Sequence, residues 1–308
     1  MKPIPIALRQ IDYVIATADT GSTAAAARLL SVSQPSVSLA IAKVEAHLGR
    51  ALFVRTAGQG VVPTAFGRLK LGEYRQLRAR AELVLLGGEQ GREVMDLGVF
   101  STLGPRYAPS LVRQFEEAHP GAQIRLHEGD IEALANWLEG GQIDVALTYD
   151  FGLPSTWEVL PLADVRPYGL VPAGHRLEGR SEVGLAELLE DPLILMNLPH
   201  SRGYFLTLAQ MQGVTPQVAH ETGSVEMLRS MVANGMGVGL LATDIPHGTA
   251  YDGRAIIRVA LAGNLASHRI ALVRSKRLQA DALTDAFCRY AVEAFADQNA
   301  EAVRPPCR

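Results

Sequence analysis

Residues 22–49 read STAAAARLLSVSQPSVSLAIAKVEAHLG and contain two short helical patterns joined by a turn at 31–33. Ser22 is placed to cap the first helix and Ser33 the second, because serine hydroxyls accept hydrogen bonds from the free N–H groups of a first helical turn. Pro35 follows in the first turn of the second helix, where a missing N–H costs nothing. The stretch therefore predicts a compact helical hairpin.

The second helix of this hairpin has an apolar stripe and a face of small residues. Residues Val37, Ile41, Val44 and Leu48 recur at helical spacing and predict the buried side. The predicted outward side holds Ser36, Leu39, Ala40 and Lys43. Hairpin geometry alone leaves two interpretations open. The pair can be a helix-turn-helix whose second helix enters the major groove of DNA, or an αα-hairpin inside a helical bundle.

The segment after the hairpin predicts a β-hairpin and then a long helix. Leu52–Val54 and Val61–Val62 are strand-like and flank a glycine-rich turn, so they predict a wing. Arg55 lies beside that turn, where it can reach phosphates or the minor groove. From Thr64 to about Leu86 the pattern is amphipathic and rich in arginine and glutamate, which favours a helix that pairs with a second copy of itself.

Charge is distributed unevenly along the chain. Residues 1–88 hold 3 Lys and 8 Arg against 2 Asp and 3 Glu, whereas the whole chain has a net charge of −3. The first part therefore suits a polyanionic partner, and the acidic remainder suits a different task. The alternative is that the arginines of the long helix only solvate its surface.

The length and composition limit the classes of protein to which the chain can belong. With 308 residues and 48% hydrophobic content, the chain is expected to form about two domains. Cys288 and Cys307 form neither a disulfide framework nor a CxxC pair, which fits a reducing compartment. The first ten residues have no apolar export core, and no apolar run approaches the roughly 18 residues of a membrane span. We therefore expect a cytoplasmic protein with no membrane association.

Strands and helices alternate in the acidic remainder, which predicts a mostly parallel sheet. The expected strands are 94–100, 124–127, 144–149, 192–198, 219–221, 237–241 and 268–274. The expected helices are 104–118, 131–138 and a closing helix at 278–296. The segment 160–172 is expected to carry the chain into a second lobe.

Candidate ligand residues follow from the rule that ligands bind at the carboxyl ends of strands. This rule selects Ser101, Thr102, Thr148 and Ser224, and the predicted loop at 198–205 adds His200, Ser201 and Arg202 beside Tyr204 and Phe205. A cation, hydroxyls and aromatic neighbours suit a small carboxylate with an apolar body. The alternatives are N-caps for the serines at 101 and 224, a surface or inter-lobe ion pair for the arginine, and a packing role for the histidine.

Enzyme signatures are absent from the sequence. The stretch GMGVGLL at 235–241 lacks GxGxxG spacing and a lysine, and neither HExxH nor GxSxG occurs. We therefore predict no catalytic residue, no metal site and no cofactor beyond a small-molecule effector. For residues 90–300 taken alone, the alternative is a solute-binding or sensor protein of the periplasmic-binding-protein type, without a DNA function.

Several fixed-spacing pieces in one order resemble the LysR-type transcriptional regulators. They are GST-AA-RL at 21–29, SVSQPSVS at 31–38, E-HLG at 45–49, LF-R at 52–55 and PTAFG at 63–67. The resemblance extends over about 290 residues. It implies a winged helix-turn-helix, a dimerising linker helix and an effector domain of two Rossmann-like lobes, like a periplasmic binding protein. It also implies homodimers or homotetramers on double-stranded promoter DNA that act as activators or repressors, with RNA polymerase as a further partner.

The resemblance also carries over to single residues. Gln34, Pro35 and Ser38 match family positions that meet DNA, and Arg55 matches a wing contact. Ser33, Ser36, Leu39 and Lys43 complete the predicted DNA-binding set, with Lys43 assigned as a phosphate contact from its outward position. Effector pockets of the family recur at positions matching Ser101, Thr102, Thr148 and Ser201.

Two positions depart from the family pattern. Leu39 stands where relatives often have a base-reading arginine, and the wing tip at 57–60 reads AGQG without an arginine. Both departures favour recognition by thymine-methyl contact and DNA shape over direct hydrogen bonding.

These observations predict four segments. Residues 1–63 form the winged helix-turn-helix, and 64–92 form the linker helix and hinge. Residues 93–300 form the effector domain, with lobe I at about 93–163 and 268–300 and lobe II at about 164–267. A tail covers 301–308.

Overall fold

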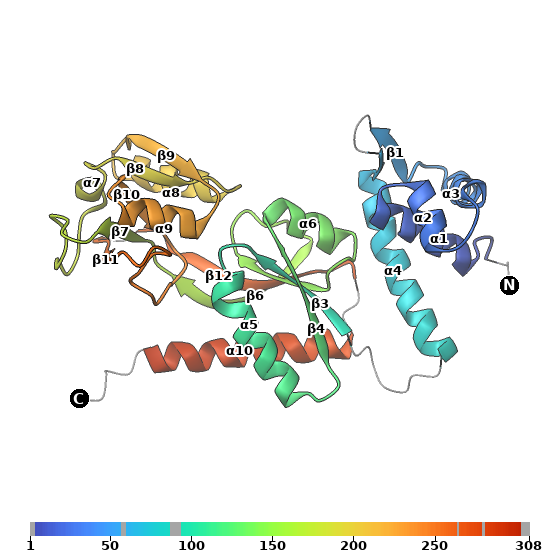
Figure 1. Cartoon of the computed structure of the whole chain (residues 1–308). Helices are drawn as coiled ribbons and strands as arrows, with labels where there is room; N and C mark the ends of the chain where they lie inside the picture. Colours follow the sequence, from blue (N-terminus) through green and yellow to red (C-terminus); the bar gives the residue numbers. More distant parts are fainter. Residues whose placement is uncertain (1–3, 57–59, 87–93, 264, 279–280, 303–308) are drawn as a thin grey trace.

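The structure is a computed structural model that describes residues 4–56, 60–86, 94–263, 265–278 and 281–302. A small helical module lies at one end, and a long helix leads from it toward two mixed α/β lobes (Figure 1). Each lobe contains its own five-stranded sheet. The architecture is the predicted winged helix-turn-helix followed by a two-lobed effector domain.

The N-terminal module contains three helices and a two-stranded wing. Its elements are α1 (Leu8–Thr20), α2 (Thr23–Leu29), α3 (Gln34–Leu48), β1 (Phe53–Thr56) and β2 (Gly60–Pro63). The Ser22 hydroxyl accepts a hydrogen bond from the Ala25 N–H, and the Ser33 hydroxyl accepts one from the Ser36 N–H, each at 3.3 Å. Both predicted caps are therefore confirmed, and they fix where α2 and α3 begin.

Small and branched residues form the core of this module. Val14, Ala26, Val37, Val44 and Leu52 are fully buried, so the three helices and the start of the wing share one apolar cluster. Alanine on α2 lets its neighbours approach closely because it has no side chain beyond Cβ. The packing of the three helices leaves the opposite side of α3 exposed to solvent.

Two details of the α3 prediction are wrong. Ala40 is 6% exposed and belongs to the core, whereas Ala42 is exposed in its place. The reason is helical periodicity, since position 40 is three residues after Val37 and lies on the same face. Leu48 is only partly buried because it lies in the last turn, at the edge of the cluster.

Helix α4 (Ala65–Leu86) begins where the wing ends. The Thr64 hydroxyl accepts a hydrogen bond from the Gly67 N–H at 2.8 Å and donates one to the Ala51 carbonyl at 2.9 Å. A Cβ on Gly67 would overlap the Leu52 carbonyl oxygen. The PTAFG piece therefore has a physical basis: threonine caps the linker helix, and glycine allows the backbone contact that ties this helix to the wing.

Lobe I contains a sheet in the order β4-β3-β5-β12-β6. Its strands are β3 (Val94–Phe100), β4 (Gln123–Gly129), β5 (Val145–Tyr149), β6 (Trp157–Val165) and β12 (His268–Ser275). Strands β3, β4 and β5 are parallel, whereas β12 runs antiparallel between β5 and β6. The last strand therefore returns to the first lobe, as predicted.

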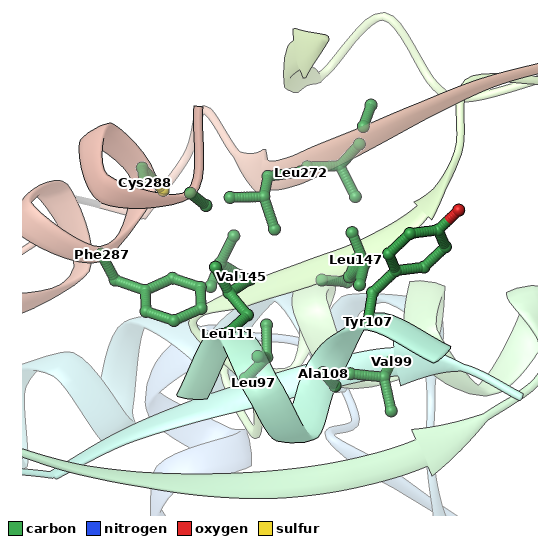
Figure 2. Close-up of a cluster of buried hydrophobic side chains, with 14 of the residues drawn as sticks. Leu97, Val99, Tyr107, Ala108, Leu111, Val145, Leu147, Leu272, Phe287 and Cys288 are labelled. Carbon is green, nitrogen blue, oxygen red and sulfur yellow. The ribbon is translucent and has the colours of Figure 1, made fainter. Parts of the chain in front are cut away.

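Helices cover both faces of this sheet. They are α5 (Gly104–Ala118), α6 (Ile131–Glu139) and α10 (Ala282–Ala302). Figure 2 shows Leu111 of α5 and Phe287 of α10 meeting Val145 and Leu147 of β5 on one face. On the other face a Cβ on Gly98 would overlap Leu134 of α6, so only glycine lets that helix lie so close to β3.

Lobe II contains a sheet in the order β11-β7-β10-β8-β9. Its strands are β7 (Tyr168–Pro172), β8 (Leu193–Met196), β9 (Val218–Thr222), β10 (Val238–Leu241) and β11 (Ile256–Ala260). Its helices are α7 (Leu185–Leu188), α8 (Ser201–Met211) and α9 (Val225–Ala233). Strands β8, β9 and β10 are parallel, and β7 and β11 are antiparallel to their neighbours. A second apolar cluster fills this lobe.

Several sequence expectations require correction. The segment 160–172 carries the chain into lobe II, as predicted, through the end of β6 and the whole of β7, but β11 was not predicted because its sequence IIRVA is short and interrupted by Arg258. The closing helix begins at Ala282, after Asp281 accepts a hydrogen bond from the Thr284 N–H at 2.8 Å. The predicted loop at 198–205 is helical from Ser201 onward. Within the described ranges, no helix has the length and apolar character needed to cross a membrane.

Candidate functional site

The exposed face of α3 carries the predicted DNA-binding residues. Ser33, Gln34, Pro35, Ser36 and Lys43 are exposed, Ser38 is half-buried, and the Leu39 side chain is 59% exposed. The stripe formed by Val37, Ile41 and Val44 is buried, which turns these residues outward. A large apolar side chain thus stands in the middle of a small, polar surface.

Hydrogen bonds organise the start of this face. The hydroxyl oxygens of Ser33 and Ser36 lie 2.7 Å apart, and the Gln34 side-chain amide donates to the Thr23 hydroxyl at 3.4 Å. The first turn of a helix presents free N–H groups and a partial positive charge, both of which suit a phosphate. The N-terminus of α3 therefore presents donors of the kind that suit a DNA backbone.

The wing is attached to α3 by a single carboxylate. One Glu45 oxygen accepts hydrogen bonds from the Leu52 N–H at 2.7 Å and the Phe53 N–H at 3.1 Å. Arg55 follows on β1, paired with Val61 of β2, and its side chain is exposed. Residues 57–59 of the predicted wing tip lie outside the described residues.

The two lobes meet through polar side chains at the carboxyl ends of strands. The Tyr149 hydroxyl at the end of β5 lies 2.7 Å from the Thr243 hydroxyl, which follows β10. Burial raises the pKa of Tyr149, and a hydrogen bond with the Thr102 side chain opposes that rise. Tyr168 donates to the Thr243 carbonyl at 2.8 Å, and burial raises the pKa of its phenol to about 12. These hydroxyl groups all remain protonated at neutral pH.

Aromatic rings surround a histidine at the same junction. The ring centroid of His268 lies 3.6 Å from that of Tyr204 and 4.8 Å from that of Tyr149. Phe151 lies 6.2 Å from the rings of both His268 and His200, so lobe I and lobe II both contribute. Burial lowers the pKa of His268 to about 4, which keeps its imidazole neutral at pH 7. These side chains of the junction are thus uncharged, aromatic and rich in hydroxyls.

The predicted effector residues occupy several places around this junction. Ser101 and Thr102 follow β3, and Thr102 hydrogen-bonds with Tyr149. Thr148 is 1% exposed, and because side chains alternate along a strand it faces the opposite side of the sheet from Tyr149. His200 precedes α8 and contacts the ring of Phe151 across the junction.

The remaining predicted residues have local partners. Ser201 is the first residue of α8. The Arg202 guanidinium pairs with the Glu221 carboxylate at 3.2 Å, so this cation already has a counter-charge. The Ser224 hydroxyl accepts from the Met227 N–H at 3.3 Å and caps α9. The cap of α5 is Leu103 rather than Ser101.

Sequence reasoning missed four residues of the junction: Tyr149, Phe151, Thr243 and His268. The strand-end rule contained enough information to find two of them, since Tyr149 directly follows Thr148 and Thr243 follows β10. His268 begins a strand instead of ending one, so no strand-end rule selects it. Across the described part of the chain, no group of three His, Cys, Asp or Glu side chains is arranged to hold a metal ion.

Two family descriptions cover nearly the whole chain. Residues 8–68 match the bacterial regulatory helix-turn-helix protein, lysR family, and residues 88–296 match the LysR substrate binding domain. The chain belongs to the LysR family. Members of this family are DNA-binding transcription regulators with an effector-binding domain, and the two folded parts described above correspond to these two functions.

Known LysR-family proteins resemble the chain along most of its length. The uncharacterized regulator YvbU of Bacillus subtilis is 28% identical over 243 residues, which cover 76% of this chain and 81% of YvbU. OxyR of Escherichia coli, a DNA-binding transcriptional dual regulator, is 27% identical over 252 residues, covering 80% and 82%. A crystal structure of HinK, a LysR family regulator from Pseudomonas aeruginosa, shares 34% identity with a TM-score of 0.65, covering 94% of this chain and 99% of HinK.

Proposed function

We propose that this LysR-family chain binds double-stranded promoter DNA through α3 and the wing, and that a small carboxylate effector bound between the lobes sets its activity. The active species is a homodimer or homotetramer in which α4 pairs with another copy. Effector binding then switches transcription of a target gene by activation or repression, with RNA polymerase as the downstream partner.

The DNA-binding proposal rests on charge and shape. Residues 1–88 carry the cationic excess of the chain, and the exposed face of α3 has small side chains around Leu39. Small residues let a helix sink into the major groove, and Lys43 and Arg55 are exposed for phosphate contacts. An apolar Leu39 suits contact with a thymine methyl group. Sequence preference would then come from methyl contact and DNA shape together.

The hydrogen bond between Tyr149 and Thr243 carries the effector proposal. It joins lobe I to lobe II through two neutral hydroxyls, which a polar ligand can replace as donors and acceptors. A ligand that binds one lobe arrangement better than another shifts the population toward it. The lobes are connected to the DNA-binding module through α4, so such a shift changes the spacing of paired recognition helices.

A carboxylate fits the donors around this junction. Thr102, Tyr149 and Thr243 offer hydroxyl groups, and neutral His268 offers an imidazole N–H. Arg202 supplies the nearby cation that we expected from sequence, and a carboxylate there would have to compete with Glu221. The aromatic rings of Phe151 and Tyr204 would contact an apolar body.

Hydrogen peroxide is the alternative effector suggested by relatives. Several relatives 27% identical to the chain are hydrogen peroxide-inducible genes activators. Thiolate is the reactive form of cysteine. Cys288 is buried in lobe I, and burial raises its pKa to about 11, which makes it a poor peroxide target. We therefore expect peroxide not to act through Cys288, and Cys288→Ser to leave DNA binding as it is.

Competition binding tests the DNA proposal. The purified chain should prefer the intergenic DNA upstream of its own gene over shuffled DNA of equal length at ~150 mM salt. Equal affinity for both DNAs would reject the proposal. A shuffled duplex of the same base composition controls for the charge-driven binding that every cationic module shows.

Thermal-shift screening tests the effector proposal. A library of small carboxylates and their neutral amides should contain an acid that raises the melting temperature when its amide does not. If Arg202 provides the cation, Arg202→Ala should abolish that shift, whereas Arg113→Ala, on the exposed face of α5, should retain it. A shift that survives Arg202→Ala would remove Arg202 from the effector site.

A further inference from the structure

Lobe II contains a cavity of about 260 Å³ whose wall comes from this lobe alone. Its wall includes Tyr168, Leu170, Arg229, His247, Ile256 and Arg258. Leu170 and Arg229 are buried, whereas His247 and Arg258 are exposed, so the cavity has a closed floor and an open mouth. An engineered cavity of roughly 150 Å³ can hold benzene, so this one has room for a small aromatic ligand.

Arg229 makes this cavity unusual, since it is 2% exposed. One of its terminal nitrogens donates to the carbonyls of His247 at 2.6 Å and Thr249 at 2.9 Å. Its Nε is buried and donates no hydrogen bond to the described residues, and the Glu226 carboxylate lies 3.5 Å away at the surface. Arg229 is thus a buried cation in the cavity wall, with one carboxylate at ion-pair distance on the surface side, and a buried cation favours an anion that can approach it.

A second arginine stands at the mouth. The Arg258 guanidinium lies 3.9 Å from the centre of the Tyr168 ring and pairs with the Asp244 carboxylate. Two arginines therefore face a wall otherwise made largely of leucine, isoleucine and proline. We propose that this cavity is a second ligand site, distinct from the junction between the lobes, and that it binds a small carboxylate with a compact apolar body.

The site is connected to the contact between the lobes. Asp244 pairs with Arg258, and its backbone carbonyl accepts a hydrogen bond from Arg106 of lobe I at 3.0 Å. A carboxylate bound by Arg258 competes with Asp244 for the same donors. Occupancy of the cavity therefore loosens the segment that Arg106 holds, and binding in lobe II becomes coupled to the position of lobe I.

Arg229 also fastens the segment after β10 to α9, so its removal can unfold lobe II without testing any ligand. Two other variants avoid this difficulty. Arg258→Gln removes the exposed cation, and Ile256→Phe fills the cavity while both arginines remain, because Ile256 lies on the same face of β11 as Arg258. Arg254→Gln is the matched control, because Arg254 also belongs to lobe II, is exposed and pairs only locally with Asp252 among the described residues.

Isothermal titration of the full chain with sodium benzoate tests the proposal, with benzamide as the neutral probe. Benzoate should bind with a stoichiometry of one per chain, and benzamide should bind at least tenfold more weakly. Arg258→Gln and Ile256→Phe should each weaken benzoate binding about tenfold or more, with unchanged circular dichroism, whereas Arg254→Gln should not.

Absence of benzoate binding at millimolar concentration would overturn the proposal, as would benzoate binding that both cavity variants retain. Benzoate binding that is lost in Tyr149→Phe and kept in Ile256→Phe would place the ligand between the lobes and likewise overturn it. DNA binding is measured separately on the same variants. If benzoate does not bind in the cavity, the proposed regulatory function is still tested by the DNA-binding result.

Discussion

The hydroxyl groups of Tyr149 and Thr243 lie 2.7 Å apart and join two sheets that share no strand. Tyr149 ends β5 in lobe I, and Thr243 follows β10 in lobe II. Thr102 hydrogen-bonds with the same tyrosine, and Tyr168 donates to the Thr243 backbone. This short chain of hydroxyls is therefore where a change in the angle between the lobes must break or remake hydrogen bonds.

Removing the Tyr149 hydroxyl should weaken the closed arrangement of the lobes. We expect Tyr149→Phe to lower the free energy of unfolding by about 1 kcal/mol, because Thr243 is left with an unsatisfied hydroxyl. Adding Thr243→Val to Tyr149→Phe should lower the free energy of unfolding only slightly further, since the two hydroxyls act as a pair. Chemical denaturation of the two single variants and the double variant checks this coupling, and additive losses would show that the hydroxyls act independently.

Acid should destabilise the protein through His268. Its folded-state pKa is about 4 and its usual value is 6.5, so the unfolded chain binds more protons between these pH values. The stability that neutral His268 provides is therefore present at pH 7 and is lost as the pH falls from 6.5 toward 4. At pH 5 the loss should be about 2 kcal/mol. Denaturation curves at pH 7 and pH 5 should show a smaller difference for His268→Phe than for the parent chain.

Leu39 should contribute to sequence discrimination more than to total affinity. We expect Leu39→Ala to reduce the preference for the target site by about 1–3 kcal/mol, the usual value of one specific base contact. Lys43→Gln is the comparison, because a phosphate contact should weaken all DNA sequences alike and reduce the salt slope by about one. Titrations of target and shuffled DNA at several salt concentrations separate the two effects. A uniform loss in Leu39→Ala would make Leu39 a structural residue.

The Glu45 carboxylate should hold the wing in place. In Glu45→Ala the Leu52 and Phe53 N–H groups lose their shared acceptor, so we expect their hydrogen exchange to accelerate about tenfold for each 1.4 kcal/mol lost. Glu45→Gln keeps an acceptor oxygen and should retain most of the protection. Hydrogen exchange resolved to these amides provides the measurement, and unchanged exchange in the alanine variant would show that β-pairing alone holds the strand.

The linker helix should transmit movement through Arg75. Its guanidinium contacts Asp19 of α1 and the Gly140 carbonyl in lobe I, so one side chain of α4 contacts both folded parts. We expect Arg75→Gln to increase the maximum dimension measured by small-angle X-ray scattering. Arg78→Gln is the matched control, because Arg78 pairs with Asp12 of α1 and with Glu82 of α4 itself. Equal scattering for the two variants would contradict a bracing role for Arg75.

The local elements of this chain follow closely from its residues. Ser22, Ser33 and Pro35 mark helix starts, and Gly21 and Gly49 end helices in the left-handed conformation that glycine adopts easily. Short strands were harder to predict. β11 contains a charged residue within five positions, and its pairing with β7 depends on residues more than 80 positions away in the sequence.

The candidate site residues show the same difference between local and long-range contacts. The outward side chains of α3 could be predicted, with the exception of the alanines at 40 and 42, because helical periodicity places each residue relative to its own neighbours. The junction between the lobes could not, because Tyr149, Thr243 and His268 come from three distant segments. Their contacts depend on how two separately folded sheets lie against each other. No local sequence pattern predicts that arrangement.

The sequence by itself determined the order of the N-terminal elements, the family and most of the outward face of α3, since each depends on spacing within a few turns of chain. Only the tertiary structure decided that Arg202 is already paired with Glu221, that Thr148 is buried, and that Arg229 lies in a cavity of lobe II. The reason is physical. Whether a charge or hydroxyl is available to a ligand depends on which partners reach it first, and those partners are brought by the fold.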